Sequence, residues 1–123
     1  MYLLQDCPLH YWLRLKICLG VGNGIYYLHK ASLKPLVHRN ITSENILLGS
    51  RYVPKISDFG LSKLISKSGP SRLIHISDDI VISNVNMPPE ASEGRFSRRS
   101  DVFSFGIVSL LNVIFDFVVS IQN

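Results

Sequence analysis

Apolar side chains recur at intervals of three and four residues near the start of the chain. Within residues 9 to 29 they include Leu15, Cys18, Val21, Ile25 and Leu28. A helix turns once every 3.6 residues, so this spacing places them on one face of an α-helix. We therefore predict an amphipathic helix over residues 9 to 29 that packs this face against a core.

The middle of this helix reads GVGNG, with glycine at positions 20, 22 and 24. A phosphate-binding G-x-G-x-x-G loop needs a differently placed third glycine and a preceding strand, and neither is found here. Each glycine costs a helix about 1 kcal/mol relative to alanine. We expect the three glycines to allow another element to pack closely against the helix.

Two short apolar runs follow, NILL at 45 to 48 and VPKIS at 53 to 57, with GSRY between them. Apolar runs on either side of a Gly-Ser turn predict a small β-hairpin. Residues 60 to 94 are rich in serine, glycine, proline and asparagine. A loop of that length in a small protein is either functional or disordered.

The pattern becomes helical again near residue 101 and is apolar on almost every side. It predicts a central hydrophobic helix at about 101 to 119, as at the centre of a larger lobe. Polar residues inside this run favour a buried core helix over a membrane span. These residues are Ser109, Asn112, Asp116 and Ser120. The start of the chain lacks the basic end and apolar core of a signal peptide.

Composition narrows the classes of partner and compartment. The chain has 123 residues, 46% of them hydrophobic and 18% charged, which fits one globular domain. Its net charge of +4 is scattered and accompanies no groove-reading motif, so we expect no nucleic-acid partner. Cys7 and Cys18 lack metal-ligand spacing, which favours a reduced cytosolic compartment.

Polar groups gather at both ends of the predicted hairpin. The tripeptide HRN at 38 to 40 and Asn45 precede it, and DFG at 58 to 60 follows it. Since the two ends of a hairpin meet, these groups should converge. Aspartate and asparagine oxygens are ligands that Mg²⁺ prefers and often shares with nucleotide phosphates. The sequence therefore predicts a phosphoryl-transfer site.

The motifs VHRNITSENILL, KISDFGLSK, PPE and SDVFSFGIV occur in this order between about residues 10 and 113. As a set they resemble the C-terminal lobe of a eukaryotic protein kinase, and DFGLSK and SDVFSFG are most similar to plant receptor-like serine/threonine kinases. The resemblance implies a mainly α fold with a small β-hairpin, a partial α+β C-lobe without an N-lobe. Residues 1 to 123 would form one truncated kinase domain, with its catalytic loop at 37 to 45.

The resemblance also implies roles for individual residues. His38 would anchor the catalytic loop, and Asp101 would brace the loop's backbone from the start of the central helix. Arg39 would receive a phosphate from the activation segment, residues 58 to 90, through charge-assisted hydrogen bonds. The candidate phosphorylation sites in that segment are Ser62, Ser66, Ser68, Ser71, Ser77 and Ser83.

A cofactor site follows from the same motifs. Asn45 and Asp58 would hold Mg²⁺, and ATP would be the phosphoryl donor. Gly60 would let the backbone turn after the metal ligand, and Glu90 would end the activation segment as a structural residue. The other histidines lack partners at metal spacing, and we assign them to packing: His10, His29 and His75.

Two substitutions depart from the family's pattern inside the catalytic loop. Asn40 occupies the place of the aspartate that orients the substrate hydroxyl and takes its proton. An amide cannot serve as a base and carries no negative charge. Losing such a group costs roughly 10² to 10⁴ in rate. Thr42 replaces the usual lysine, so a cation that steadies the transferring phosphate is absent. The glycosylation sequon formed by NIT at 40 to 42 is expected to be chance.

Further departures lie outside this loop. The family's Gly-Thr-x-x-Gly-Tyr run appears as ISNVNM, which alters the platform for a peptide substrate, and Pro88 replaces an alanine. The Gly-rich loop, strand lysine and helix glutamate of an N-lobe have no counterpart, nor does the arginine that pairs with Glu90. We expect half of an ATP pocket and uncovered apolar surface on the central helix.

Three hypotheses remain open. The chain is an active lobe that phosphorylates protein serine and threonine, a pseudokinase module that binds an active receptor-like kinase, or a truncated gene product without function. We favour an inactive kinase lobe in the cytoplasm, whose full-length parent could be a plasma-membrane receptor. Its partner would be another receptor-like kinase or a protein substrate.

Overall fold

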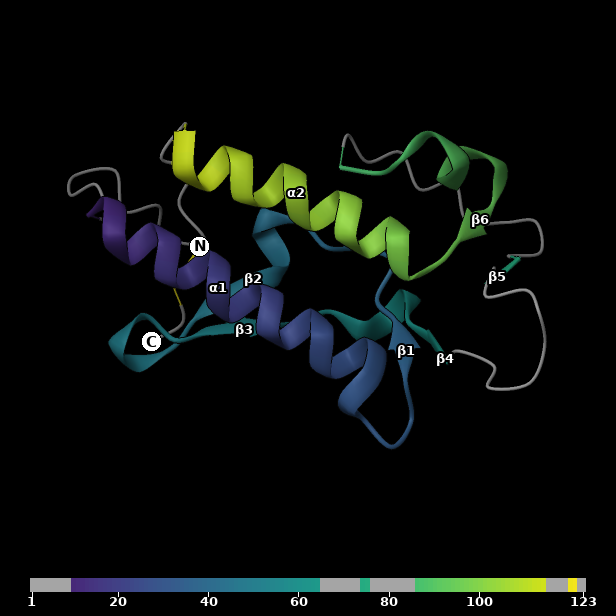
Figure 1. Cartoon of the computed structure of the whole chain (residues 1–123), viewed down its shortest axis with the longest axis horizontal. Helices are drawn as coiled ribbons and strands as arrows, with labels where there is room; N and C mark the ends of the chain where they lie inside the picture. The colour runs from purple at the N-terminus through teal and green to yellow at the C-terminus, as the bar shows by residue number, and fades with distance from the viewer. Residues whose placement is uncertain (1–9, 65–73, 76–85, 115–119, 122–123) are drawn as a thin grey trace.

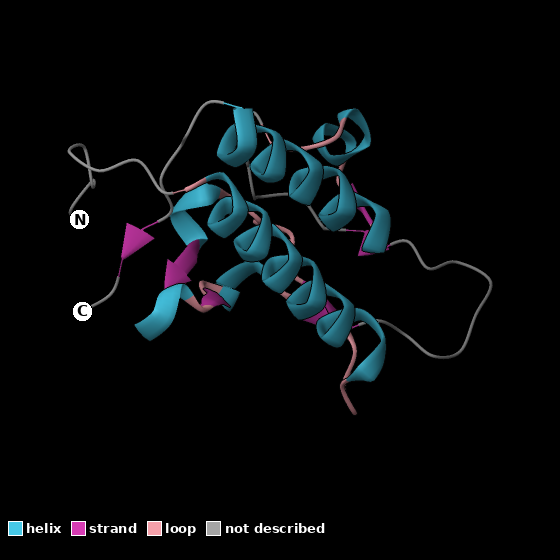
Figure 2. Cartoon of the chain, turned by 60° about the vertical axis from the view of Figure 1, so that its left-hand side comes forward, coloured by secondary structure: helices cyan, strands magenta, loops and turns pink. Residues whose placement is uncertain are grey.

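The computed structural model of this protein describes residues 10–64, 74–75, 86–114 and 120–121. Helices α1 (Tyr11–Tyr26) and α2 (Arg98–Ile114) run side by side in both views (Figure 1 and Figure 2). A hairpin of β2 (Ile46–Leu48) and β3 (Pro54–Ile56) contacts α1. The prediction of a mainly α fold with a small β-hairpin is confirmed.

The remaining strands are short and pair at the edges of this core. β1 (Leu36–Val37) pairs antiparallel with β4 (Lys63–Leu64), β5 (Ile74–His75) pairs antiparallel with β6 (Arg95–Phe96), and β7 (Ser120–Ile121) lies parallel to β2. A π-helical turn, Tyr27–Ala31, extends α1. The 3₁₀ turns are Ser43–Asn45, Ser50–Tyr52, Phe59–Leu61 and Pro89–Glu93.

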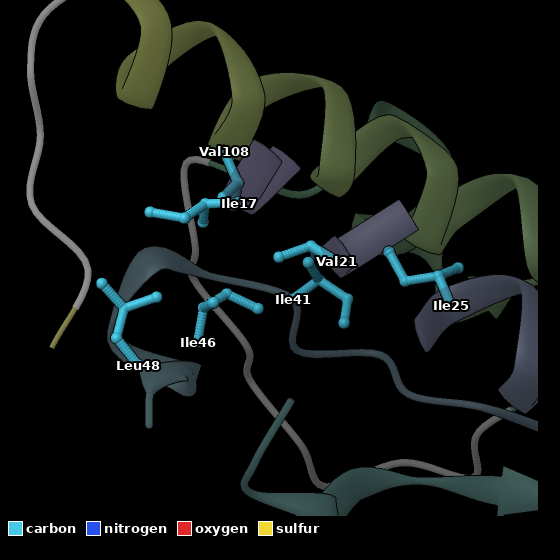
Figure 3. Packing of buried hydrophobic residues seen from close by; sticks show 7 residues of the cluster. All are labelled: Ile17, Val21, Ile25, Ile41, Ile46, Leu48 and Val108. Carbon is cyan, nitrogen blue, oxygen red and sulfur yellow. The ribbon is translucent and has the colours of Figure 1, made fainter. Parts of the chain in front are cut away.

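One apolar cluster joins the two helices to the hairpin (Figure 3). It contains Ile17, Val21, Ile25, Ile41, Ile46, Leu48 and Val108. The predicted face of α1 is therefore only partly right, since Leu15, Cys18 and Leu28 are half-buried and Ile17 was missed. The helix buries a row spaced by four residues, because it is covered by α2 and the hairpin together.

The glycines of α1 lie at its closest contacts, as predicted. A Cβ added at Gly20 would come within 2.5 Å of Pro54 Cγ, and one at Gly24 within 3.0 Å of Ile56 Cδ1. At Gly22 it would lie 3.3 Å from the Phe105 ring on α2. Larger side chains at these positions would push α1 away from β3 and α2.

Helix α2 begins three residues before the predicted start, because Ser97 caps it. Ser97 Oγ accepts the Arg99 N–H at 3.2 Å, and the Ser97 N–H donates to Ser100 Oγ at 2.9 Å. This reciprocal pair is a capping box that the apolar pattern could not reveal. The described part of α2 reaches Ile114, and the predicted helical end at 119 falls within residues 115–119, which lie outside the described residues. Ser120–Ile121 form β7.

The buried face of α2 is largely polar. Asp101, Ser104 and Asn112 are buried beside Val108, while three large apolar residues remain exposed: Val102, Phe103 and Leu110. Uncovered apolar surface on this helix was predicted from the sequence. Within the described residues, neither helix is long and apolar enough to cross a bilayer. The serines at 66, 68, 71, 77 and 83 lie outside the described residues.

Arg14 joins the end of α2 to the start of α1. Its Nη1 donates to the carbonyl oxygens of Asn112 at 3.2 Å and Val113 at 3.0 Å. In return, Asn112 Nδ2 donates to the Arg14 carbonyl at 3.2 Å. A cation at the carbonyl end of a helix complements the helix dipole, so this contact fixes the two helices side by side.

Candidate active site

Two antiparallel strand pairs hold the predicted site residues between them. The β1–β4 pair aligns Val37 with Lys63, and the β2–β3 pair aligns Ile46 with Ile56. Residues 38–45 and 57–62 both run from one pair to the other, so they lie side by side. The predicted convergence of the two ends of the hairpin is present in the structure.

A buried carboxylate, that of Asp101, binds the first of these segments from α2. Its Oδ1 accepts the Arg39 N–H at 2.9 Å, and its Oδ2 accepts the His38 N–H at 2.8 Å. The same Oδ2 lies 2.8 Å from His29 Nε2. Asp101 is only 1% exposed, so these donors replace the water that it has lost. We call Asp101 with its partners His29, His38 and Arg39 the Asp101 brace.

His29 is a member of the Asp101 brace that the sequence did not reveal, since it was assigned to packing alone. The π-helical turn at the end of α1 carries it, and its side chain is 6% exposed beside Asp101. The two residues are 72 positions apart, and no spacing rule connects them. A histidine at the end of an amphipathic pattern was the only available signal, and it is a weak one.

The imidazole of His38 is completely buried and uses both of its nitrogens. Its Nε2 lies 2.7 Å from the Ser57 carbonyl oxygen, and its Nδ1 accepts the Asn40 N–H at 3.1 Å. These partners define the neutral tautomer with hydrogen on Nε2. The Phe59 ring packs edge-on against the imidazole at 5.0 Å between ring centres. His38 thereby ties residue 40 to the segment that follows β3.

Arg39 turns inward beneath the loop, with a backbone φ of 73° and 4% of its surface exposed. Its Nε donates to the Leu61 carbonyl oxygen, and its guanidinium carbon lies 5.4 Å from the centre of the Phe96 ring. Burial lowers the pKa of Arg39, while the nearby Asp101 carboxylate acts in the opposite direction. Among the described residues, its Nη1 is buried without a hydrogen-bond partner.

Asn40, Asn45 and Asp58 form a connected polar group in front of the brace. Asn45 Nδ2 donates to the Asn40 carbonyl oxygen at 2.8 Å, and Asn40 Nδ2 donates to Asp58 Oδ2 at 3.5 Å. The Asn45 carbonyl oxygen accepts the Ser57 N–H at 2.8 Å, which joins both segments again. The structure thus brings together the residues predicted for the catalytic and metal positions.

The backbone turn at DFG differs from the prediction. Asp58 itself adopts the left-handed conformation, with φ 60° and ψ 71°, whereas Gly60 has no positive φ. A Cβ at Gly60 would lie 3.5 Å from Asp58 Oδ1, which is an ordinary contact. Aspartate tolerates this region better than most residues, because its short side chain can form local hydrogen bonds. The turn thus depends on Asp58 rather than on glycine.

Three other predicted residues lie outside this group. Thr42 precedes the turn Ser43–Asn45, is half-buried and makes no capping hydrogen bond with its side chain. Ser62 Oγ donates to the His38 carbonyl oxygen at 3.5 Å. Glu90 is half-buried in the turn Pro89–Glu93 and, within the described part of the chain, has no hydrogen bond or ion pair with the other predicted site residues.

No cluster of three or more His, Cys, Asp or Glu side chains occurs among the described residues. An all-protein metal cage is therefore absent from this part of the molecule. The oxygens of Asp58 and Asn45 form a smaller donor set, of the kind that Mg²⁺ supplements with water and phosphate. Asn45 Nδ2 already donates a hydrogen bond to the Asn40 carbonyl oxygen, so the amide oxygen of Asn45 is the atom that can act as a metal ligand.

A buried frame that holds a loop beside a DFG turn is the arrangement of a protein kinase C-lobe, and comparison with known families agrees. The family described as "Protein tyrosine and serine/threonine kinase" matches residues 3–114. The chain belongs to the protein kinase family, as its motifs indicated.

The curated relatives that it matches include plant kinases of the receptor-like type. It is 42% identical over 104 residues to a probable leucine-rich repeat receptor-like serine/threonine-protein kinase of Arabidopsis thaliana, covering 84% of this chain and 10% of that protein. A probable receptor-like protein kinase of the same plant is 39% identical over 89% of this chain and 13% of its own length. A probable serine/threonine-protein kinase of Arabidopsis thaliana is 42% identical over 84% of this chain and 26% of its own length. The chain thus spans a small part of each relative.

Proposed function

We propose that this chain is a C-lobe of a receptor-like serine/threonine kinase that does not transfer phosphate itself. Its inherited chemistry is ATP-dependent phosphorylation of protein serine and threonine. The observation that carries the proposal is the hydrogen bond from Asn40 Nδ2 to Asp58 Oδ2, at 3.5 Å. Residue 40 presents an N–H to the neighbouring carboxylate at the place where the reaction needs a proton acceptor.

An amide at this place changes the chemistry in two ways. It cannot accept the proton of a substrate hydroxyl, and it adds no negative charge beside the attacking oxygen. Thr42 adds to the deficit, because a hydroxyl cannot replace a cation near the transferring phosphate. Loss of the base alone accounts for roughly 10² to 10⁴ in rate.

The residues that remain fit Mg²⁺ and phosphate. Asp58 is exposed, and the free amide oxygen of Asn45 belongs to the same polar group, so these two would hold the ion. Bound there with ATP, Mg²⁺ would neutralise phosphate charge. Arg39 retains a buried donor that suits an anion from the activation segment. The proposal therefore includes binding of a nucleotide by this chain, and it places the chain in the cytoplasm.

Phosphate transfer from radiolabelled Mg-ATP to the chain itself and to a generic protein substrate tests the proposal. We expect the unmodified chain to match the background of the Asp58→Ala variant. Glu44→Ala is the matched control, because Glu44 is an exposed acid on the same loop. Transfer by the unmodified chain that Asp58→Ala abolishes and Glu44→Ala leaves intact would contradict the proposal.

Cation binding can be measured separately with Mn²⁺ and electron paramagnetic resonance. We expect Mn²⁺ to bind the unmodified chain and Glu44→Ala alike, and to be lost from Asp58→Ala. Equal binding by all three proteins would show that Asp58 is not a metal ligand.

A second candidate is a pseudokinase module that docks an active receptor-like kinase. The exposed Val102, Phe103 and Leu110 on α2 favour it, because large apolar patches commonly mark protein contacts. Capture of the kinase domain of a leucine-rich repeat receptor-like kinase, weakened by Phe103→Ser, is the expected result. Capture that Phe103→Ser leaves unchanged would argue against this surface. The remaining alternative, a gene product without function, would show neither binding nor transfer.

A further inference from the structure

The outer face of α1 carries large apolar side chains on a helix whose inner face is already packed. Trp12 and Leu19 are each 67% exposed, and Tyr26 is 61% exposed. The three residues are spaced by seven, so they form one line along the helix with a drift of only about 20° per step. We call Trp12, Leu19 and Tyr26 the outer α1 stripe. An isolated exposed leucine needs no explanation, but an aligned row with two aromatic residues does.

Positive charge accompanies this stripe. Between residues 10 and 43 the chain has no Asp or Glu, while it has five Lys or Arg residues. Arg14 and Arg39 are engaged internally, but Lys16, Lys30 and Lys34 are exposed. Lys16 follows Trp12 by four positions and Lys30 follows Tyr26 by four, so each cation lies beside an end of the stripe.

We propose that the outer α1 stripe docks an acidic amphipathic helix of a partner protein. A row of apolar residues seven apart supplies one of the two core positions of a helix–helix seam, and Lys16 and Lys30 stand four positions on, at the flanking position where charges select the partner. A partner helix with leucines facing the stripe and glutamates facing Lys16 and Lys30 would complement it in shape and charge. This inference is independent of whether the site transfers phosphate.

Two other occupants fit the surface less well. A second copy of the chain would bring Lys16 and Lys30 against the same lysines, and like charges at flanking positions oppose pairing. A lipid surface needs a wide apolar face, whereas the stripe is bordered by Lys16 and exposed Asn23 on one side. On the other side Gly22 faces Phe105 of α2, which narrows the apolar strip at its centre, and only Tyr11 and Tyr27 widen it, at its two ends.

The probe is a synthetic helix of about three heptads with leucine at positions a and d and glutamate at e and g. Its glutamates repel one another, which keeps it from pairing with itself. Binding to the full chain is measured by fluorescence of Trp12, the single tryptophan. We expect Leu19→Gln to weaken binding about tenfold, because it removes the centre of the stripe. Val53→Gln also replaces an exposed aliphatic side chain with glutamine, but on the hairpin turn, and it should leave binding unchanged.

Charge reversal separates docking from non-specific attraction. The double variant Lys16→Glu/Lys30→Glu should bind the glutamate peptide roughly tenfold more weakly than the unmodified chain does. It should instead bind a matching peptide with lysine at e and g. Circular dichroism of each variant checks that the helices are retained, as expected for exposed positions.

Several results would overturn the proposal. An affinity that Leu19→Gln leaves unchanged would show that the stripe does not select an acidic helix. Equal binding of the glutamate and lysine peptides would show the same. Partition onto vesicles of phosphatidylserine and phosphatidylcholine, with no peptide binding, would assign the stripe to a lipid surface. A dimer in sedimentation that Leu19→Gln dissociates would assign it to a second copy.

Discussion

The Asp101 brace and the Asn40–Asp58 pair lie next to each other, yet they are built differently. In the brace a carboxylate that is 1% exposed lies 2.8 to 2.9 Å from three partner nitrogens. In the pair an amide donates at 3.5 Å to a carboxylate on the exposed surface. Short hydrogen bonds to a buried charge contribute far more than a long one at the surface. The brace therefore holds the backbone of residues 38 and 39 firmly, whereas the contact between the Asn40 and Asp58 side chains is long and lies at the surface.

The largest effect is expected from Asp101→Ala. It would leave two backbone N–H groups and the His29 side chain buried without their acceptor, a loss of about 3 to 5 kcal/mol in the free energy of unfolding. Urea unfolding followed by circular dichroism measures this loss. Ser109→Ala, a change on the same helix, is the control, because its hydroxyl has no partner among the described residues. A loss below about 1 kcal/mol for Asp101→Ala would contradict the brace.

His29→Ala should have the next largest effect. It removes one hydrogen bond to a charged partner and opens a small cavity, so we expect a loss of about 2 kcal/mol in the free energy of unfolding. His29→Gln, which can still donate to Asp101, should recover part of that loss. Equal losses for the alanine and glutamine variants would mean that His29 acts by filling space alone.

Asn40→Asp should destabilise the chain by about 0.5 to 1 kcal/mol at low salt. It places a second carboxylate about where an amide now donates to Asp58, and like charges near a surface repel modestly. Adding Mg²⁺ should recover most of the loss, because the two carboxylates would share the cation. Thermal unfolding with and without Mg²⁺ checks this. A loss that Mg²⁺ cannot reverse would indicate disturbed packing instead.

Thr42→Lys should have the smallest effect, within about 0.5 kcal/mol of the unmodified chain in urea unfolding. The Thr42 side chain makes no capping hydrogen bond, and it is only half-buried. The variant should also gain no phosphate transfer, since a cation cannot replace the base that residue 40 lacks. Measurable transfer by Thr42→Lys alone would show that Asn40 is not the limiting defect.

The sequence predicted the parts of this molecule that depend on local patterns. The hairpin and the convergence of residues 38–45 with the DFG turn follow from apolar runs and turn residues. The close packing at Gly20 and Gly24 was likewise expected from residue type alone. These features need only short stretches of chain, so one sequence contains enough information to place them.

Features that depend on distant contacts were not predictable in the same way. The pairing of His29 with Asp101 spans 72 residues, and the left-handed conformation of Asp58 was not expected from the sequence, which drew attention to Gly60 as the residue that lets the backbone turn. The buried row of α1 includes Ile17 because α2 and the hairpin cover the helix together. In each case tertiary packing decided between alternatives that local propensity left equal.

Hydrogen exchange of the His38 and Arg39 backbone amides, followed by NMR, tests most directly whether the frame is independent of residue 40. These two N–H groups donate to Asp101, so their protection reports the brace itself. We predict equal protection in the unmodified chain and in Asn40→Asp with Mg²⁺ present, and loss of protection in Asp101→Ala. Loss of protection in Asn40→Asp, or its retention in Asp101→Ala, would contradict the account.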